Sequence, residues 1–451
     1  MVGSVLERRL PLFPISTRVE TRGGRDCLTV AGLALAELAE AHGTPLYLYD
    51  QATLDSAVAG YRHALAEHFP GEAGITYAGK AFLCVAMAQW TERRGLWLDC
   101  TGAGELHVAK VAGVAGEHIL VHGVQKTQAD LAAAVSQSGT LVVDSLAELD
   151  TLVSGFADWP GSMPDLWLRI RPGVAVETHA YRQTGQADSK FGMGWTEVAE
   201  AVRLCQVQRL PLTGLHFHLG SHFRDPAPLG PALDRVLDLV GALQEESGWV
   251  PEVLCPGGGW GVAYHEDGLP HPAVGDYVGF LAGCVVEGCA RRGLPLPRLQ
   301  LEPGRSIVAQ AGVALYRLGA VKRTSHCRWL LLDGGLADNP RPALYGSRYS
   351  ALPVWDPGRP AEGKAWLAGP YCESGDILIE DLTMPNVEPG ELIAVPVSGA
   401  YQLSMASNYN GARRPAVIWL DEGRAHLVQR RQTVDDLVSR DLPLEGGRGE
   451  P

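Results

Sequence analysis

Two of the motifs that could do chemistry carry a lysine and a pair of histidines. YAGKAF places Lys80 in an apolar stretch, where loss of solvent lowers a lysine's pKa and lets its amine form a Schiff base. A lysine at a rim, extending its ammonium to solvent, is the structural alternative. HFHLGSH carries His216 and His218, which strand alternation sends to one face. Imidazoles can bind a metal or stack on a flat ring, and stacking is favoured because no nearby carboxylate or cysteine completes a ligand set.

Two further motifs suit an anion and a ring nitrogen. The glycines of PGGGWG, Gly257, Gly258 and Gly259, let backbone N–H groups approach an anion, although a tight turn would also need glycine. LEPGRS carries Glu302 and Arg305, which could equally be a structural ion pair. Together the four motifs supply what pyridoxal phosphate needs: a lysine, a flat group, a phosphate nest and a partner for the ring nitrogen. A carboxylate partner keeps that nitrogen protonated, which favours decarboxylation over racemisation.

Two segments nearer the C-terminus add reactive groups. GPYCESGD contains Cys372 beside Glu373 in a polar, glycine-containing loop, which suits a proton donor better than an inert core cysteine. DGGLADNPRPALYG contains Arg341 and Tyr345 on a loop stiffened by proline, a setting suited to binding a carboxylate.

The sequence predicts that alternating strands and helices position these residues. Eight β-prone runs lie between residues 74 and 308, and segments with helical spacing separate them. The runs are GITYAGKA, GLWLDCTG, HILVHG, TLVVDS, DLWLRIRPG, LTGLHFHLG, PEVLCPGGG and RLQLEPGR. This order favours a (β/α)₈ barrel, which gathers reactive groups at the carboxyl ends of its strands, over an open sheet.

The sequence pattern changes after Val308, where β-prone runs interrupted by Gly, Pro and Asp replace the alternation of strands and helices. We expect residues 49–308 to form the cofactor-binding barrel and residues 309–444 to form a β-barrel or sandwich. Residues 1–48 should join that second domain, and residues 445–451 should be a frayed tail.

Composition excludes several classes of protein. The chain has 451 residues, 46% hydrophobic and 20% charged, which rules out wholesale disorder and a small disulfide-stapled domain. Its net charge of −13 argues against nucleic-acid binding. The sequence contains no apolar run of membrane-spanning length and no signal-peptide pattern, so we expect a cytoplasmic protein without membrane contact. Its nine cysteines include no CxxC pair, so we expect neither disulfides nor a metal site.

These motifs, together with GAY and SMASNYN, occur in the order found in diaminopimelate decarboxylases, and the sequence resembles that family from about His42 to Leu437. The resemblance implies that pyridoxal phosphate is bound, with Lys80 as the Schiff-base lysine, by Lys80, His218, Ser221, Gly257, Gly258, Gly259, Glu302, Pro303, Gly304, Arg305 and Tyr401. It assigns substrate binding to Arg305, Arg341, Tyr345, Glu373 and Tyr401, and catalysis to Lys80 and Cys372, with Cys372 protonating the product.

The resemblance also implies a reaction and an assembly. The reaction is decarboxylation of meso-2,6-diaminopimelate to L-lysine and CO₂, in a homodimer whose sites receive Cys372 and Glu373 from the second subunit. The same chemistry on another amino acid, or on a carrier-linked or citrylated one, is the alternative. A silent cofactor-binding regulatory relative is a third hypothesis, which intact Lys80 and Cys372 disfavour. Phe82, His222 and the loop 179–192 depart from the family pattern, so the reaction is better specified than the substrate.

Overall fold

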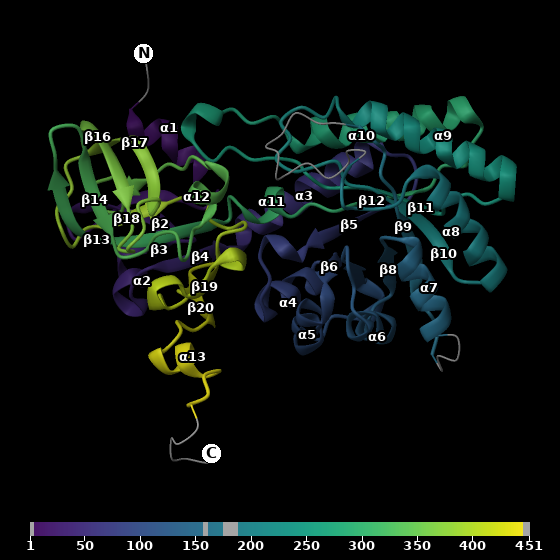
Figure 1. Ribbon diagram of the computed structural model, residues 1–451. Coiled ribbons are helices and arrows are strands. Elements are labelled where there is room, and N and C mark those ends of the chain that lie inside the picture. The colour runs from purple at the N-terminus through teal and green to yellow at the C-terminus, as the bar shows by residue number, and fades with distance from the viewer. Residues whose placement is uncertain (1–3, 157–160, 175–187, 445–451) are drawn as a thin grey trace. The chain divides into compact units, whose positions relative to one another are not determined.

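The chain folds into two compact units (Figure 1). The computed structural model describes residues 4–156, 161–174 and 188–444. The barrel unit comprises residues 53–263 and 267–309, and the β unit comprises residues 1–52, 264–266 and 310–451. The expected tail, 445–451, and residues 179–187 of the divergent loop lie outside the described residues.

The barrel unit contains eight parallel strands that close on themselves, which confirms the barrel and excludes the open sheet. Each predicted run forms one strand, and the strands follow the ring order β10-β11-β12-β5-β6-β7-β8-β9. Their bounds are β5 (Ala73–Ala78), β6 (Trp97–Thr101), β7 (Ile119–His122), β8 (Thr140–Val143), β9 (Asp165–Arg169), β10 (Leu212–His216), β11 (Val253–Gly257) and β12 (Arg298–Leu301).

Helices lie on the outside of this ring (Figure 1). In α9, apolar residues at helical spacing, such as Leu229, Leu233, Val236 and Val240, are buried, so one stripe of the helix covers the strands. The helices that follow the strands are α4 (Val85–Arg93), α5 (Gly102–Ala112), α6 (Gln128–Gln137), α7 (Leu146–Gly155), α8 (Trp195–Gln208), α9 (Leu229–Ser247), α10 (Val274–Arg292) and α11 (Arg305–Val308). Helix α3 (Gln51–His68) precedes β5.

The β unit is built on a nine-stranded sheet, together with a three-stranded sheet of β1 (Arg18–Arg22), β2 (Arg25–Val30) and β3 (Leu33–Ala34). The larger sheet runs β17 (Ile377–Pro385), β16 (Ala361–Ala368), β14 (Arg328–Leu332), β13 (Gly312–Arg323), β4 (Leu46–Asp50), β19 (Ala416–Asp421) and β20 (Arg424–Gln429). Strand β18 (Leu392–Val395) pairs with β13 and with β15 (Leu352–Pro353). Strand β4 lies between β13 and β19, so N-terminal residues are integral to this sheet.

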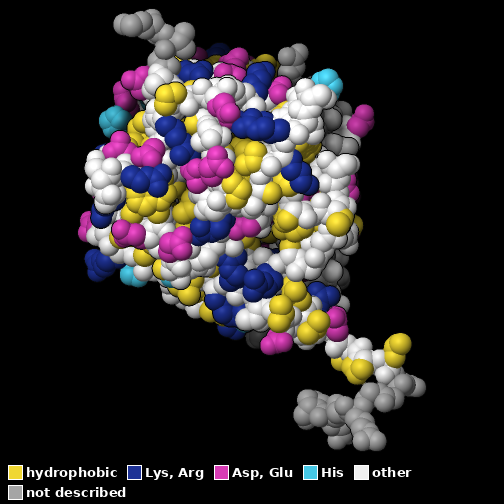
Figure 2. All heavy atoms as spheres, turned by 90° about the vertical axis from the view of Figure 1, so that its left-hand side faces the viewer, with side chains coloured by type: hydrophobic (Ala, Val, Ile, Leu, Met, Phe, Trp, Pro, Cys, Tyr) yellow, Lys and Arg dark blue, Asp and Glu magenta, His cyan; other side chains and the backbone are white. Residues whose placement is uncertain are grey.

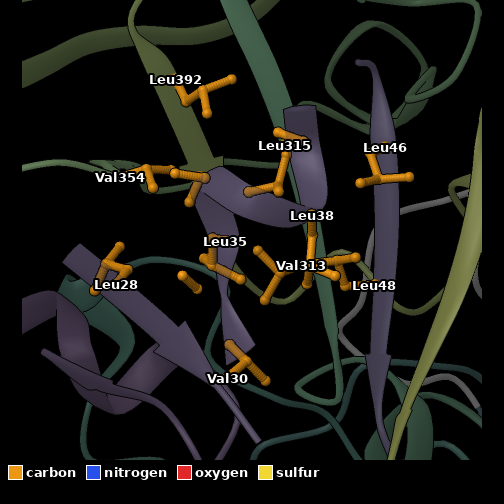
Figure 3. Packing of buried hydrophobic residues seen from close by; sticks show 14 of the residues in the cluster. Leu28, Val30, Leu35, Leu38, Leu46, Leu48, Val313, Leu315, Val354 and Leu392 are labelled. Atoms are coloured by element: carbon orange, nitrogen blue, oxygen red, sulfur yellow. The ribbon is translucent and has the colours of Figure 1, made fainter. Parts of the chain in front are cut away.

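The core of the β unit follows from alternation along β4 and β13. Leu46 and Leu48 point into an apolar cluster, where Val313 and Leu315 of β13 meet them (Figure 3). The intervening Tyr47 and Tyr49 belong to the opposite face of the sheet, where their hydroxyls form hydrogen bonds. Helix α2 (Leu35–His42) and strand β2 complete the cluster (Figure 3). Each buried leucine contributes roughly 1.5–3 kcal/mol through loss of apolar surface from water.

The surface shown in Figure 2 carries acidic, basic and hydrophobic side chains interspersed, and neither sign of charge covers that face. Among the described residues, no helix combines the length and the hydropathy needed to cross a membrane.

Candidate active site

The carboxylate of Glu302 lies buried where the barrel strands end. It follows β12, and histidines that end two other strands donate hydrogen bonds to it. Nε2 of His122 lies 2.9 Å from Oε1, and Nε2 of His216 lies 3.1 Å from Oε2. Burial alone would raise the pKa of Glu302, but the two histidines outweigh burial and lower it well below its usual range. Glu302 is therefore an anion at neutral pH.

Two neighbours of Glu302 are uncharged. Burial lowers the pKa of His216 to about 4, so this imidazole is neutral at pH 7. Burial also raises the pKa of the Cys255 thiol, which hydrogen-bonds Glu302, well above its ordinary value. Ligand atoms of His122, His216 and Glu302 lie within 4.8 Å of one another, as metal ligands could. Their N···O distances of 2.9 and 3.1 Å are those of direct hydrogen bonds, which account for the arrangement.

Four polar residues at this end of the barrel are missing from the predicted set: His122, Asp99, Asp144 and Arg169. Nε2 of His122 lies 4.0 Å from Oδ1 of Asp99, and Nε of Arg169 lies 3.8 Å from Oδ1 of Asp144. Each lies near the end of an apolar strand or directly after one, in ILVH, LDCT, LVVD and LWLR. A polar residue at the carboxyl end of an apolar strand could have identified all four from the sequence, because such residues gather at one end of a barrel.

The predicted anion nest has the close backbone approach that glycine permits. A Cβ atom added at Gly258 would overlap the carbonyl oxygen of Glu302, and one at Gly259, where φ is +111°, would lie 2.5 Å from the carbonyl oxygen of Gly220. Nη2 of Arg305 donates to Oγ of Ser221 at 3.1 Å. The loops after β10, β11 and β12 thus approach one another so closely that no side chain fits at Gly258 or Gly259, a setting that suits a phosphate.

The turn that joins β12 to α11 also ties the barrel's first and last strands together. The carbonyl of Pro303 accepts a hydrogen bond from the backbone N–H of Ala78 at 3.1 Å, at the end of β5. A Cβ atom at Gly304 would lie 3.0 Å from Cβ of Ala78. Pro303 and Gly304 therefore hold Glu302 against the strand that leads to Lys80.

Lys80 is exposed, which corrects the expectation of an ammonium in apolar surroundings. Strand β5 ends at Ala78, and Lys80 lies in the 3₁₀ turn η2 (Gly79–Ala81) that follows the strand. The positive charge of Lys80 still acts on His218, which is partly buried. Burial first, and then this charge, lower the pKa of His218 well below its ordinary value, so its imidazole is neutral.

Arg341 lies in the β unit and begins a short helix, α12 (Arg341–Tyr345), where the sequence predicted a loop. Pro342, at a position where proline's fixed φ suits a first helical turn, explains the difference. Arg341 is 1% exposed, and its guanidinium lies 4.4 Å from the ring centroid of Tyr264 and donates to the hydroxyl of Tyr349. Within the described part of the chain, no carboxylate pairs with it.

The remaining predicted residues also lie in the β unit. Cys372 and Glu373 are exposed, and the backbone N–H of Cys372 donates to Oδ1 of Asn410 at 2.9 Å. Tyr345 and Tyr401 are partly buried, and Tyr401 has a φ of 61°, an uncommon conformation for a bulky residue. The expected set is therefore divided: the cofactor residues except Tyr401 gather in the barrel unit, and the substrate residues other than Arg305 belong to the β unit.

Comparison with known proteins gives one consistent result. The family described as pyridoxal-dependent decarboxylase, pyridoxal binding domain, matches residues 54–309. Diaminopimelate decarboxylase of Bacillus subtilis is 39% identical over 426 residues, covering 93% of this chain and 96% of that protein. The enzyme of Actinosynnema pretiosum is 40% identical over 439 residues, covering 96% and 95%.

A solved structure agrees with the sequence matches. Diaminopimelate decarboxylase from M. jannaschii, crystallised with L-lysine, superimposes with a TM-score of 0.86 at 28% identity, covering 95% of this chain and 98% of that chain. Since the barrel, the motifs and near full-length relatives all agree, this chain belongs to the diaminopimelate decarboxylase family of pyridoxal-dependent decarboxylases.

Proposed function

We propose that the protein decarboxylates meso-2,6-diaminopimelate to L-lysine and CO₂ with pyridoxal phosphate as cofactor. The observation that carries this proposal is the buried, ionised Glu302 at the same end of the barrel as Lys80 and the glycine nest. When bound, pyridoxal phosphate supplies an electron sink for the electron pair that remains on Cα as the carboxylate departs. An anionic partner for the ring nitrogen favours that sink because it keeps the nitrogen protonated.

The barrel residues fit this cofactor. Lys80 is exposed directly after β5, where its amine can bind an aldehyde, and neutral His218 provides a flat ring. Gly257, Gly258 and Gly259, with Ser221 and Arg305, offer backbone and side-chain donors to a phosphate. Glu302 would accept a hydrogen bond from the protonated ring nitrogen, and Pro303 and Gly304 fix its position.

The substrate's distal amino-acid head is assigned to the β unit. Arg341 is a buried guanidinium without a carboxylate partner among the described residues, and a buried cation is costly unless an anion joins it. The second carboxylate of diaminopimelate supplies that anion. Glu373 would bind the distal amine, while Tyr345, Tyr401 and Arg305 complete the set.

The same proposal makes the enzyme a homodimer in which Cys372 and Glu373 of one subunit serve the site of the other. Both residues are exposed, so they are accessible to a partner. Mixing Lys80→Ala chains with Cys372→Ala chains should restore part of the activity through hybrid dimers. Mass spectrometry of the mixture would verify subunit exchange, and an inactive mixture after exchange would refute shared sites.

We assign the enzyme to the cytoplasm because all nine cysteines are free thiols. Thiols persist in a reducing compartment and are oxidised outside it.

A substrate panel tests the proposed reaction. The purified protein would be incubated with meso-diaminopimelate, L-ornithine, L-arginine and L-lysine, while CO₂ and the amino-acid product are measured. We expect CO₂ and L-lysine from diaminopimelate alone. Faster turnover of another amino acid would transfer the assignment to that substrate, and no turnover of any compound by cofactor-loaded protein would favour a silent relative.

A further inference from the structure

Three strands of the barrel supply hydrogen-bond donors to one carboxylate. His122 ends β7, His216 ends β10 and Cys255 lies in β11, and all three bond to the side chain of Glu302 after β12. His122 and His216 occupy different oxygens, so neither carboxylate oxygen can rotate away without breaking a bond. Glu302 is therefore held in a single orientation.

The contact made by His122 comes from farther round the barrel than the other two. In the closed ring, two strands, β5 and β6, separate β7 from β12, whereas one strand, β11, separates β10 from β12. The His122 side chain is 10% exposed, and its ring centroid lies 4.6 Å from that of His216. Packing against His216 fixes the direction of the His122 N–H, so this donor is already aligned toward Oε1 before any ligand arrives.

Two of the three donors to Glu302 carry no charge at pH 7. His216 is neutral at pH 7 and Cys255 is a thiol, so these two donors stabilise the carboxylate without cancelling its charge. A buried anion attracts a cation of matching geometry. The protonated nitrogen of a pyridine ring is such a cation.

We propose that His122 is a positioning residue, whose Nε2–H bond to Oε1 fixes Glu302 in the orientation that accepts a hydrogen bond from the protonated ring nitrogen of the cofactor. This inference rests on the proposed role of Glu302 as partner of that nitrogen. His122 does not touch the reacting atoms. It acts through Glu302, and its loss should be felt only by ligands that carry a ring nitrogen.

Comparing the affinities for two forms of the cofactor, with and without the ring nitrogen, distinguishes a positioning role of His122 from a general effect on folding or binding. The bound cofactor would be removed with hydroxylamine, and dissociation constants would be measured by tryptophan fluorescence for pyridoxal phosphate and for its 1-deaza analogue, in which carbon replaces the ring nitrogen. We expect wild type to prefer pyridoxal phosphate. The variant His122→Phe should lower this preference at least tenfold while its affinity for the 1-deaza analogue stays near that of wild type.

Additional variants make the result decisive. His122→Gln places an amide N–H near the position of Nε2 and should restore most of the preference, whereas His122→Asn is too short and should not. His122→Asn also replaces His122→Phe if the latter fails to fold. His118→Gln, at a histidine that contacts Glu92 away from Glu302, is the matched control and should behave as wild type.

Each remaining outcome identifies what failed. If Glu302→Gln abolishes the preference and His122→Phe and His122→Asn retain it, the positioning role is refuted while the role of Glu302 stands. If Glu302→Gln itself retains the preference, Glu302 is not the partner of the ring nitrogen, and the proposed function loses that assignment together with the inference. Equal weakening of both ligands by His122→Phe would show a structural role only.

Discussion

The guanidinium of Arg341 lies 4.4 Å from the ring centroid of Tyr264, although 77 positions separate the two residues in the sequence. Tyr264 belongs to a three-residue segment, 264–266, that leaves the barrel unit and joins the β unit. Glu266 of the same segment also binds residues of the β unit, since it pairs with buried Arg9 at 2.8 Å and accepts a hydrogen bond from Oγ of Ser350 at 2.6 Å. The position of Arg341 thus depends on a stretch that sequence order places inside the barrel.

Replacing Arg341 tests recognition of the distal carboxylate. We expect Arg341→Ala to lower kcat/KM for diaminopimelate by roughly 10²-fold or more, because a buried charge pair with the substrate is lost. Cofactor affinity, measured by fluorescence, should not change, since the cofactor residues of the barrel are untouched. Arg323→Ala, at an exposed side chain, is the control. Wild-type turnover of ornithine or lysine at a rate similar to that of diaminopimelate would contradict this role.

Replacing Lys80 tests covalent attachment of the cofactor. Borohydride reduction followed by mass spectrometry should find pyridoxyl on Lys80 in wild type and on no lysine in Lys80→Ala. Lys126, another lysine near these strand ends, cannot substitute because its Nζ lies 2.7 Å from Oε1 of buried Glu148 and 2.8 Å from the carbonyl of Val142. Lys110→Ala, on α5, is the control. Pyridoxyl still fixed in Lys80→Ala would overturn the assignment.

Replacing a glycine of the nest by alanine tests whether the close backbone approach at Gly258 is needed for cofactor binding. We expect Gly258→Ala to weaken cofactor binding and to lower the melting temperature, because its Cβ would overlap the backbone of Glu302. Gly241→Ala is matched, since it adds a methyl within α9 where no atom lies within 4 Å, and it should raise stability by roughly 0.5–1 kcal/mol. Unchanged cofactor affinity in Gly258→Ala would mean that the nest is only a turn.

A buried acid in the β unit should make stability depend on pH. Oδ2 of Asp338 accepts from the hydroxyls of Tyr316 at 2.5 Å and Tyr47 at 3.0 Å, and burial raises the pKa of Asp338 to about 6. Because this pKa exceeds that of the unfolded chain, the stabilisation is complete below pH ~4 and is lost as pH rises through about 6.

The variant Asp338→Asn should remove this dependence. Between pH 4.5 and 7.5 the urea midpoint of wild type should fall relative to that of Asp338→Asn, by the equivalent of at most roughly 3 kcal/mol. Asp435→Asn, at an exposed position, should follow wild type at every pH. Parallel curves for wild type and Asp338→Asn would show that Asp338 does not titrate in this range.

Much of the candidate site could be predicted from the sequence because it depends on residues that are close together along the chain. Apolar alternation specifies each strand, and polar residues at strand ends mark the reactive end of a barrel, so Glu302, His218 and the glycines were predicted. The same logic missed His122 and Arg169, which end strands equally well but carry no motif. Proline before and after Arg341 was interpreted as a stiff loop, whereas the same residues begin α12.

Sequence alone therefore determined the eight strands of the barrel and their order along the chain, and it predicted the reactive residues. Only the tertiary structure decided that the ring closes, that His122 meets Glu302 across it, and that β4 lies between β13 and β19. It also decided that Lys80 is exposed, because the strand ends two residues before it. Periodicity depends on neighbours in sequence, but pairing and burial depend on which distant surfaces exclude water together, and that is set by packing of the whole unit.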